Sequence, residues 1–174
     1  MFLLTRPHIF GLVLATIVLC TVPTRAQEQP RSADSRPAPI PPAIASAKKI
    51  FISNAGADAG LFPHPFSGTQ DRMYNQFYAA MQKWGHYELV AAPDDADLVF
   101  ELRLSGPVGP ANPDKIKGAS DPLPIFYLTI LERKSHYTLW TLTESVGIAN
   151  LQKTHDRNFD NALDALVVDL QNLI

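Results

Sequence analysis

Cysteine is almost absent from this chain of 174 residues, and the single one, Cys20, lies in a short apolar run near the amino terminus. If that run is removed on export, a disulfide framework, a thiolate nucleophile and a cysteine-ligated metal are all excluded. Histidine offers no alternative metal site, because the four histidines that follow the predicted leader, His64, His86, His136 and His155, form no closely spaced pair of ligands. We therefore expect no metal or other cofactor.

Positive charge is also scarce. The chain carries 15 Lys and Arg against 17 Asp and Glu, a formal net charge of −2. Removal of a leader that contains Arg6 and Arg25 would make the mature protein more acidic still. A protein that binds a phosphate backbone needs a basic face, so we expect no nucleic-acid partner.

A long hydrophobic run is missing as well. The apolar stretch Ile9–Cys20 has 12 residues, whereas a membrane-spanning helix needs about 20. Arg6 precedes the stretch and the small residue Ala26 follows it, which is the pattern of a secretory signal peptide. We predict cleavage after Ala26, no stable membrane span afterwards, and a periplasmic or secreted protein. A leader retained as an anchor is the alternative.

Proline is concentrated in the next segment, residues 27–47, which carries five of them together with Ser, Ala and Arg. Such a segment has too little apolar surface to offset the entropy of ordering. It predicts an extended, disordered tether. The folded domain is then expected over residues 48–174, a length that suits one domain.

Apolar periodicity in that domain predicts five strands and two helices. Strands are expected at 48–54, 87–91, 97–104, 124–132 and 138–146, and helices at 67–84 and 158–173. The pair 124–132 and 138–146 is the strongest hairpin signal. The Gly- and Pro-rich segment 105–122 has no apolar period and reads as a long loop.

Terminal signals support both predicted helices. Ser67 and Gln70 match a capping box for the first, and Gly85 is a natural stop for it. Asp156 or Asn158 can cap the second.

These elements give an α/β (α+β) fold of a single domain, in the order β-α-β-β-β-β-α. Both helices have apolar stripes that must be buried, so we expect them on one face of a mixed sheet of four or five strands. The last three long strands should form a meander. The first strand should lie beside 97–104.

One stretch resembles a known group of proteins. Residues 84–90 (WGHYELV) end a helix and begin a strand, and Asp95-Ala96-Asp97 then precedes another apolar strand. This pattern is similar to the TolB amino-terminal domain and to CsgG-type envelope domains of bacteria, and to uncharacterised exported families. The resemblance implies an α/β envelope domain used for assembly or interaction, and it brings no catalytic residues. Leu19, before Cys20, is too bulky for a lipoprotein signal.

Reactive constellations are missing from the sequence. It has no G-x-S-x-G elbow, no S-x-x-K run and no phosphate-binding loop with Gly-Lys-Ser/Thr. The segment 61–66 (LFPHPF) is unusual, because two phenylalanines in a proline-stiffened loop either pack on the domain or form a contact patch.

If the first strand is parallel to 97–104, this loop and the segment 105–122 emerge at the same end of the sheet, where α/β proteins often bind ligands. The candidate partner or ligand surface is Asn54, Asp58, Phe62, His64, Phe66, Lys115 and Lys117.

The leading hypothesis is an exported, non-enzymatic binding or assembly module whose partner is an envelope protein or protein complex. A hydrolase or a small-ligand carrier with an unrecognised site is the alternative. His64 within hydrogen-bonding distance of an acidic residue in a deep pocket would favour the hydrolase.

Overall fold

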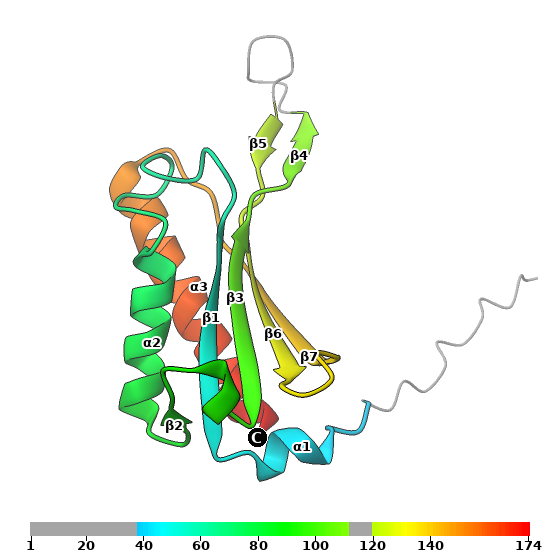
Figure 1. Cartoon of the computed structure of the whole chain (residues 1–174). Coiled ribbons are helices and arrows are strands. Elements are labelled where there is room, and N and C mark those ends of the chain that lie inside the picture. Colours follow the sequence, from blue (N-terminus) through cyan, green and yellow to red (C-terminus); the bar gives the residue numbers. More distant parts are fainter. Residues whose placement is uncertain (1–37, 112–119) are drawn as a thin grey trace, which may run out of the picture. The chain divides into compact units, whose positions relative to one another are not determined.

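A computed structural model of the chain describes residues 38–111 and 120–174, and Figure 1 shows their arrangement. The predicted signal peptide and most of the predicted tether lie outside these residues, as do Lys115 and Lys117. The elements are α1 (Pro42–Ser46), β1 (Lys49–Ala57), α2 (Arg72–Trp84), β2 (Glu88–Leu89), the 3-10 turn η1 (Pro93–Asp95), β3 (Leu98–Ser105), β4 (Val108–Ala111), β5 (Ser120–Pro122), β6 (Ile125–Glu132), β7 (Thr138–Ser145) and α3 (Gln152–Leu173).

The main sheet is mixed and has five strands in the order β2-β1-β3-β6-β7. β1 is parallel to both β2 and β3, with Ile50 opposite Leu98. β3, β6 and β7 are antiparallel neighbours, so the meander and the place of the first strand are both confirmed. The predicted hairpin forms with Leu128 opposite Leu142.

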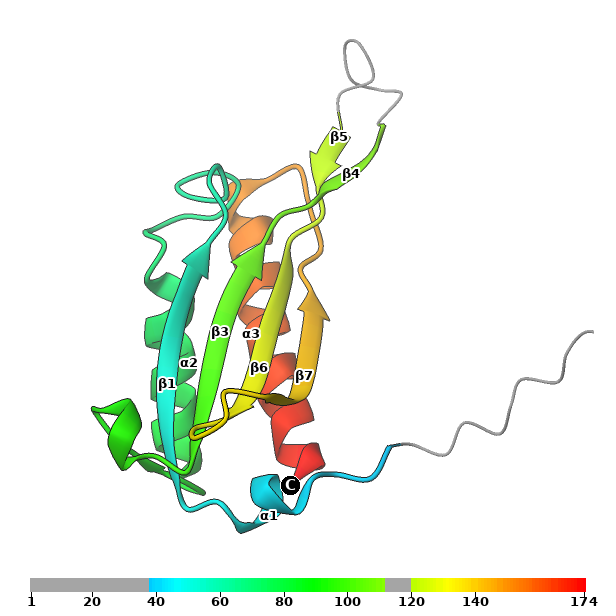
Figure 2. The ribbon, with the colours of Figure 1, turned by 45° about the vertical axis from the view of Figure 1, so that its right-hand side comes forward.

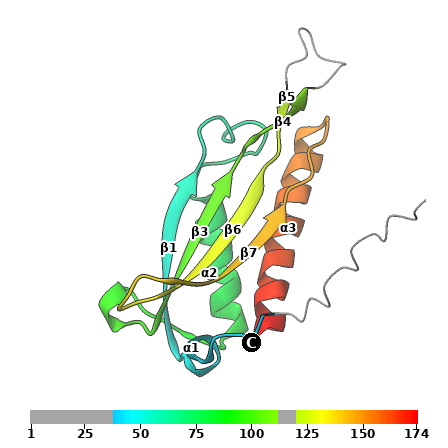
Figure 3. The ribbon, with the colours of Figure 1, turned by 90° about the vertical axis from the view of Figure 1, so that its right-hand side faces the viewer.

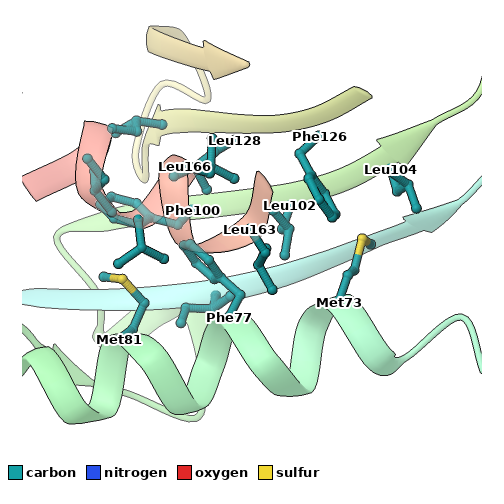
Figure 4. Packing of buried hydrophobic residues seen from close by; sticks show 14 of the residues in the cluster. Met73, Phe77, Met81, Phe100, Leu102, Leu104, Phe126, Leu128, Leu163 and Leu166 are labelled. Atoms are coloured by element: carbon teal, nitrogen blue, oxygen red, sulfur yellow. The ribbon is translucent and has the colours of Figure 1, made fainter. Parts of the chain in front are cut away.

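Both long helices cover the same face of this sheet, as Figure 2 shows. The inward side chains of β3 are Leu98, Phe100, Leu102 and Leu104, and all are buried, as the alternating pattern predicts. Figure 4 shows three of them, Phe100, Leu102 and Leu104, together with the buried stripe of α2, which is Met73, Phe77 and Met81, and the α3 residues Leu163 and Leu166. The fold class predicted from the sequence is therefore confirmed.

The end of the predicted tether is part of the folded domain. Residues Pro42–Ser46 form α1, and Ile44 is completely buried among the core residues. The proline-rich composition conceals this contribution, because one apolar residue between two alanines gives no periodic signal. The domain therefore begins before residue 48.

The segment 105–122 is not simply a loop. Its two ends form the short strands β4 and β5, which pair antiparallel in a separate ribbon, with Val108 opposite Pro122. The Leu123 N–H donates to the Pro107 carbonyl at 2.9 Å and closes the base of the ribbon. Gly and Pro within these strands remove the alternation by which strands are recognised.

Both helices begin at residues other than those predicted. α2 starts at Arg72 because Ser67 and Gly68 are used differently: the Ser67 N–H donates to Asp156 of α3, and Gly68 has a φ of +93°. α3 starts at Gln152, so Asp156 lies within the helix. The predicted capping box and the predicted Asp156 or Asn158 cap are therefore wrong. Gly85, with a φ of +68°, does end α2.

Within the described ranges, no helix has both the length and the hydropathy needed to cross a bilayer.

Candidate functional site: the loop end of the sheet

The parallel pairing of β1 and β3 brings their carboxyl ends to one end of the sheet, at the top in Figure 1. The loop that follows β1 and the ribbon that follows β3 therefore lie at the same end, as the sequence predicts. The connection from β7 to α3 reaches this end too, which Figures 2 and 3 both show. We call this region the loop end.

Asp58 joins the loop after β1 to the end of β3. Its carboxylate accepts hydrogen bonds from the Ser105 hydroxyl at 2.7 Å and the Gly106 N–H at 2.9 Å, and from Arg103 at 2.8 Å. These bonds hold the pKa of Asp58 below its usual value, the Ser105 bond contributing most. The role of Asp58 here is to fix the two loops relative to each other.

Aromatic packing fixes the segment 61–66. Phe66 has an exposure of 0%, and its ring lies 5.1 Å from that of Phe159 of α3. Phe62 is partly buried, with its ring 6.0 Å from the rings of both. The peptide bonds before Pro63 and Pro65 are both cis. The two phenylalanines thus pack on the domain.

A polar network ties α2, α3 and the loop together. Arg72 donates to Asp156 at 2.6 Å and to Asp160 at 2.7 Å, and its guanidinium lies 4.5 Å from the centre of the Phe159 ring. Burial raises the pKa of Asp156, but hydrogen bonds from the Ser67 N–H and from Arg72 outweigh it and lower this pKa to about 2. These contacts therefore fix the loop before α2 to the start of α3.

A pocket of about 550 Å³ opens at this end. Its walls come from the loop after β1, the ribbon base, the β7–α3 connection and the first turn of α3. The lining residues are Pro65, Asp121, Pro122, Ile148, Ala149, Asn150 and His155.

Exposed apolar side chains belong to the same segments as the walls of this pocket. The described residues include seven large apolar side chains that are exposed, and four of them are at the loop end. Val108 is 83% exposed and Leu151 69%, and Leu123 and Ile148 are exposed as well. We call Val108, Leu123, Ile148 and Leu151 the apolar patch. Grouped exposure of this kind marks surfaces that bind other molecules.

The predicted surface residues have different roles in the structure. Asn54 is exposed, donates to Asp71 and accepts from the Gly56 N–H. His64 is exposed and lies 3.2 Å from the amide oxygen of Gln152. Phe66 has no exposed surface and cannot contact a partner, because it fills the space over Phe159.

The β7–α3 connection was missed by sequence reasoning. Its sequence, Gly147 to Asn150, has neither the charge nor the aromatic content that draws attention to a loop. The only available signal was the apolar residue Ile148 outside any periodic element.

In the part of the chain that the structure describes, no group of three or more His, Cys, Asp or Glu residues is arranged to hold a metal ion.

No protein-family model matches this chain, and no curated protein matches it. Solved structures show distant likeness. A hemagglutinin homologue from Helicobacter pylori has a TM-score of 0.47 and 10% identity, covering 74% of this chain and 87% of that one. A PelC dodecamer from Paraburkholderia phytofirmans has a TM-score of 0.43 and 11% identity, and the match covers 71% of this chain and 87% of that one. An uncharacterised lipoprotein B from Nitrosomonas europaea has a TM-score of 0.38 and 9% identity, and the match covers 71% of this chain and 80% of that one. Likeness at this level identifies no family, and the TolB and CsgG resemblance stays a prediction.

Proposed function

We propose that this protein is an exported, non-enzymatic binding or assembly module of the bacterial cell envelope, and that it contacts an envelope protein through the apolar patch. The patch is the observation that carries the proposal. Export is supported by the predicted leader and by the proline-rich segment after it.

The position of the patch suits recognition. Val108 and Leu123 belong to the ribbon base, and Ile148 and Leu151 belong to the β7–α3 connection. Asp58 and Arg72 tie the adjoining loops to β3 and α3 through charged hydrogen bonds. A surface held this way loses little conformational entropy when a partner binds.

Substitution of the patch tests this proposal. The double variant Val108→Ser and Leu151→Ser should reduce recovery of specific partners in a crosslinking pull-down from envelope extract, quantified by mass spectrometry. Val168→Ser is the matched control, because Val168 is 50% exposed on α3 away from the loop end. Equal recovery with the double variant and the control would contradict the proposal. Both variants should melt like the parent, since exposed residues contribute little to stability.

A small-ligand carrier is the second candidate, and the pocket of about 550 Å³ favours it. The hydrolase alternative gains no such observation, because His64 faces the Gln152 amide and not a carboxylate. Asn150→Trp would fill the pocket and leave all four residues of the apolar patch unsubstituted. Loss of a ligand that co-purifies with the parent, with protein partners retained, would favour the carrier.

A further inference from the structure

The outer edge of β1 is only partly covered. β2 pairs with β1 at Lys49 and Ile50 and then leaves it. The Val90 N–H donates to the Ile50 carbonyl at 3.0 Å, while the Lys49 carbonyl accepts from Asp97 on the opposite side. Backbone groups alternate between the two edges of a strand, so Ile52 and Asn54 direct theirs to the side of β2. Among the described residues, no strand lies beside them there.

A groove of about 320 Å³ lies against this open edge. It is formed by β1, by α2 and by the residues after β2. Its lining is Phe51, Ile52, Tyr74, Asn75, Tyr78, Val90 and Ala91. The rings of Tyr74 and Tyr78 lie 6.0 Å apart and are both partly buried. Neighbouring aromatic side chains of this kind offer contact area at a low entropy cost.

The surroundings of the groove are acidic. Asp71 precedes α2 at one end, and Glu88, Asp94 and Asp95 flank the other, all four with exposed side chains. Two cations face these four acids, because Lys49 lies 3.4 Å from Glu88 and Arg133 lies 3.9 Å from Asp94, so an excess of negative charge is left at both ends. A basic segment is therefore complementary in charge to this edge.

We propose that the open edge of β1 binds an extended segment of a partner polypeptide, added as a further strand. The segment carries apolar side chains at alternate positions, which enter the groove, and Lys or Arg at its ends. Main-chain bonds to Ile52 and Asn54 supply affinity, and the tyrosines select the side chain. β2 shows how such a strand sits, because it already pairs in parallel with the start of β1. This site is separate from the apolar patch.

The probe for this site is a synthetic peptide, acetyl-Lys-Val-Thr-Val-Thr-Val-Lys-amide, titrated into the isotope-labelled exported protein. We expect amide shift changes at residues 51–55 and around Tyr74 and Tyr78, saturating at millimolar peptide or below. Replacing both lysines of the peptide by glutamate should weaken binding at least about tenfold. No shifts at millimolar peptide, or shifts confined to other surfaces, would overturn the proposal. Concentration-dependent shifts at this edge without peptide would assign it to a second copy instead and also overturn it.

Variants separate the site from a general loss of structure. Tyr78→Ala should weaken peptide binding about tenfold, and Asn75→Lys should weaken it by placing a positive charge beside the lysines of the peptide. Asn75 is exposed, so that variant keeps its fold even if Tyr78→Ala does not. Tyr137→Ala is the control, because Tyr137 is exposed in the β6–β7 turn. Unchanged affinity in Asn75→Lys would contradict the proposal. The double variant Val108→Ser and Leu151→Ser should bind the peptide normally, so the two proposed surfaces fail or succeed separately.

Discussion

Arg72 and Asp156 lie 2.6 Å apart, and this contact joins the first turn of α2 to the first turns of α3. Asp156 also accepts a hydrogen bond from the Ser67 N–H at 2.9 Å, and Arg72 donates to the Ser67 carbonyl at 3.1 Å. The pair therefore closes the loop that precedes α2 against α3. Contacts distant in sequence therefore hold this loop, while α2 itself begins without a side-chain cap.

The variant Asp156→Asn should reduce the free energy of unfolding by about 1 to 2 kcal/mol at neutral pH, because the hydrogen bonds from Arg72 and the Ser67 N–H lose the negative charge of their acceptor. Urea denaturation measures this. Asp164→Asn, an exposed aspartate of the same helix, should change it by less than about 0.5 kcal/mol. Equal effects from the two variants would contradict the role of Asp156.

The contribution of Asp156 should also depend on pH. Its pKa falls from an ordinary 3.8 to about 2 on folding, so the unfolded chain binds a proton first. The stabilisation is fully present above the unfolded pKa and is lost as the pH falls from about 4 towards 2. The difference between the parent and Asp156→Asn should shrink over this window in acid titrations followed by circular dichroism. A difference that stays constant down to the lower limit would be inconsistent with this shift.

Tyr87→Phe should leave the protein as stable as the parent or raise its unfolding free energy by up to about 1 kcal/mol. The Tyr87 hydroxyl is buried and has no hydrogen-bond partner among the described residues, and burial raises its pKa to about 12. Its ring, which packs edge-on to Phe100, is retained in the variant. Thermal unfolding tests this, and a clear loss of stability would show that the hydroxyl is bonded.

Ile44→Ala should lower the unfolding free energy by about 2 to 4 kcal/mol, because it empties a buried site in the core. The matched control is Ile40→Ala, since Ile40 lies four residues earlier and is exposed. A disordered tether up to residue 47 predicts no effect from either change. Urea denaturation of both variants therefore decides where the domain begins.

The exported protein should begin at Gln27. Amino-terminal sequencing or intact mass of material recovered from the bacterial envelope fraction measures this. A chain that still carries residues 1–26 would show that the leader is kept as an anchor.

Much of the fold follows from patterns that are local in sequence. Apolar side chains occupy every second position from Leu98 to Leu104, and the apolar residues Met73, Phe77 and Met81 recur with the helical period. Both elements and their buried faces could therefore be predicted. The hairpin of β6 and β7 was equally clear. These elements succeed because each buries its own regular apolar face against the others.

The elements that could not be predicted depend on contacts distant in sequence. Ser67 has the sequence context of a helix cap, but its N–H donates to the Asp156 carboxylate and α2 begins only at Arg72. Ile44 has no periodic neighbours, yet the core covers it. Tertiary contacts overrule local preference in both cases.

The candidate site was predicted only in its location. The order of β1 and β3 placed two loops at one end of the sheet, which is correct. Phe66 is buried, however, and the exposed apolar residues come partly from the β7–α3 connection, which carries no motif. The exposed fraction of a side chain depends on how the whole chain packs, so it cannot be predicted from a single apolar residue in a loop.

Photocrosslinking in living cells tests most directly whether the apolar patch contacts an envelope protein, as we propose. A benzoylphenylalanine placed at Val108 or at Leu151 should give a discrete, higher-mass adduct on irradiation. The same probe at Val168, an exposed apolar position outside the patch, should give none. No adduct from either patch position, or the same adducts from Val168, would contradict the claim.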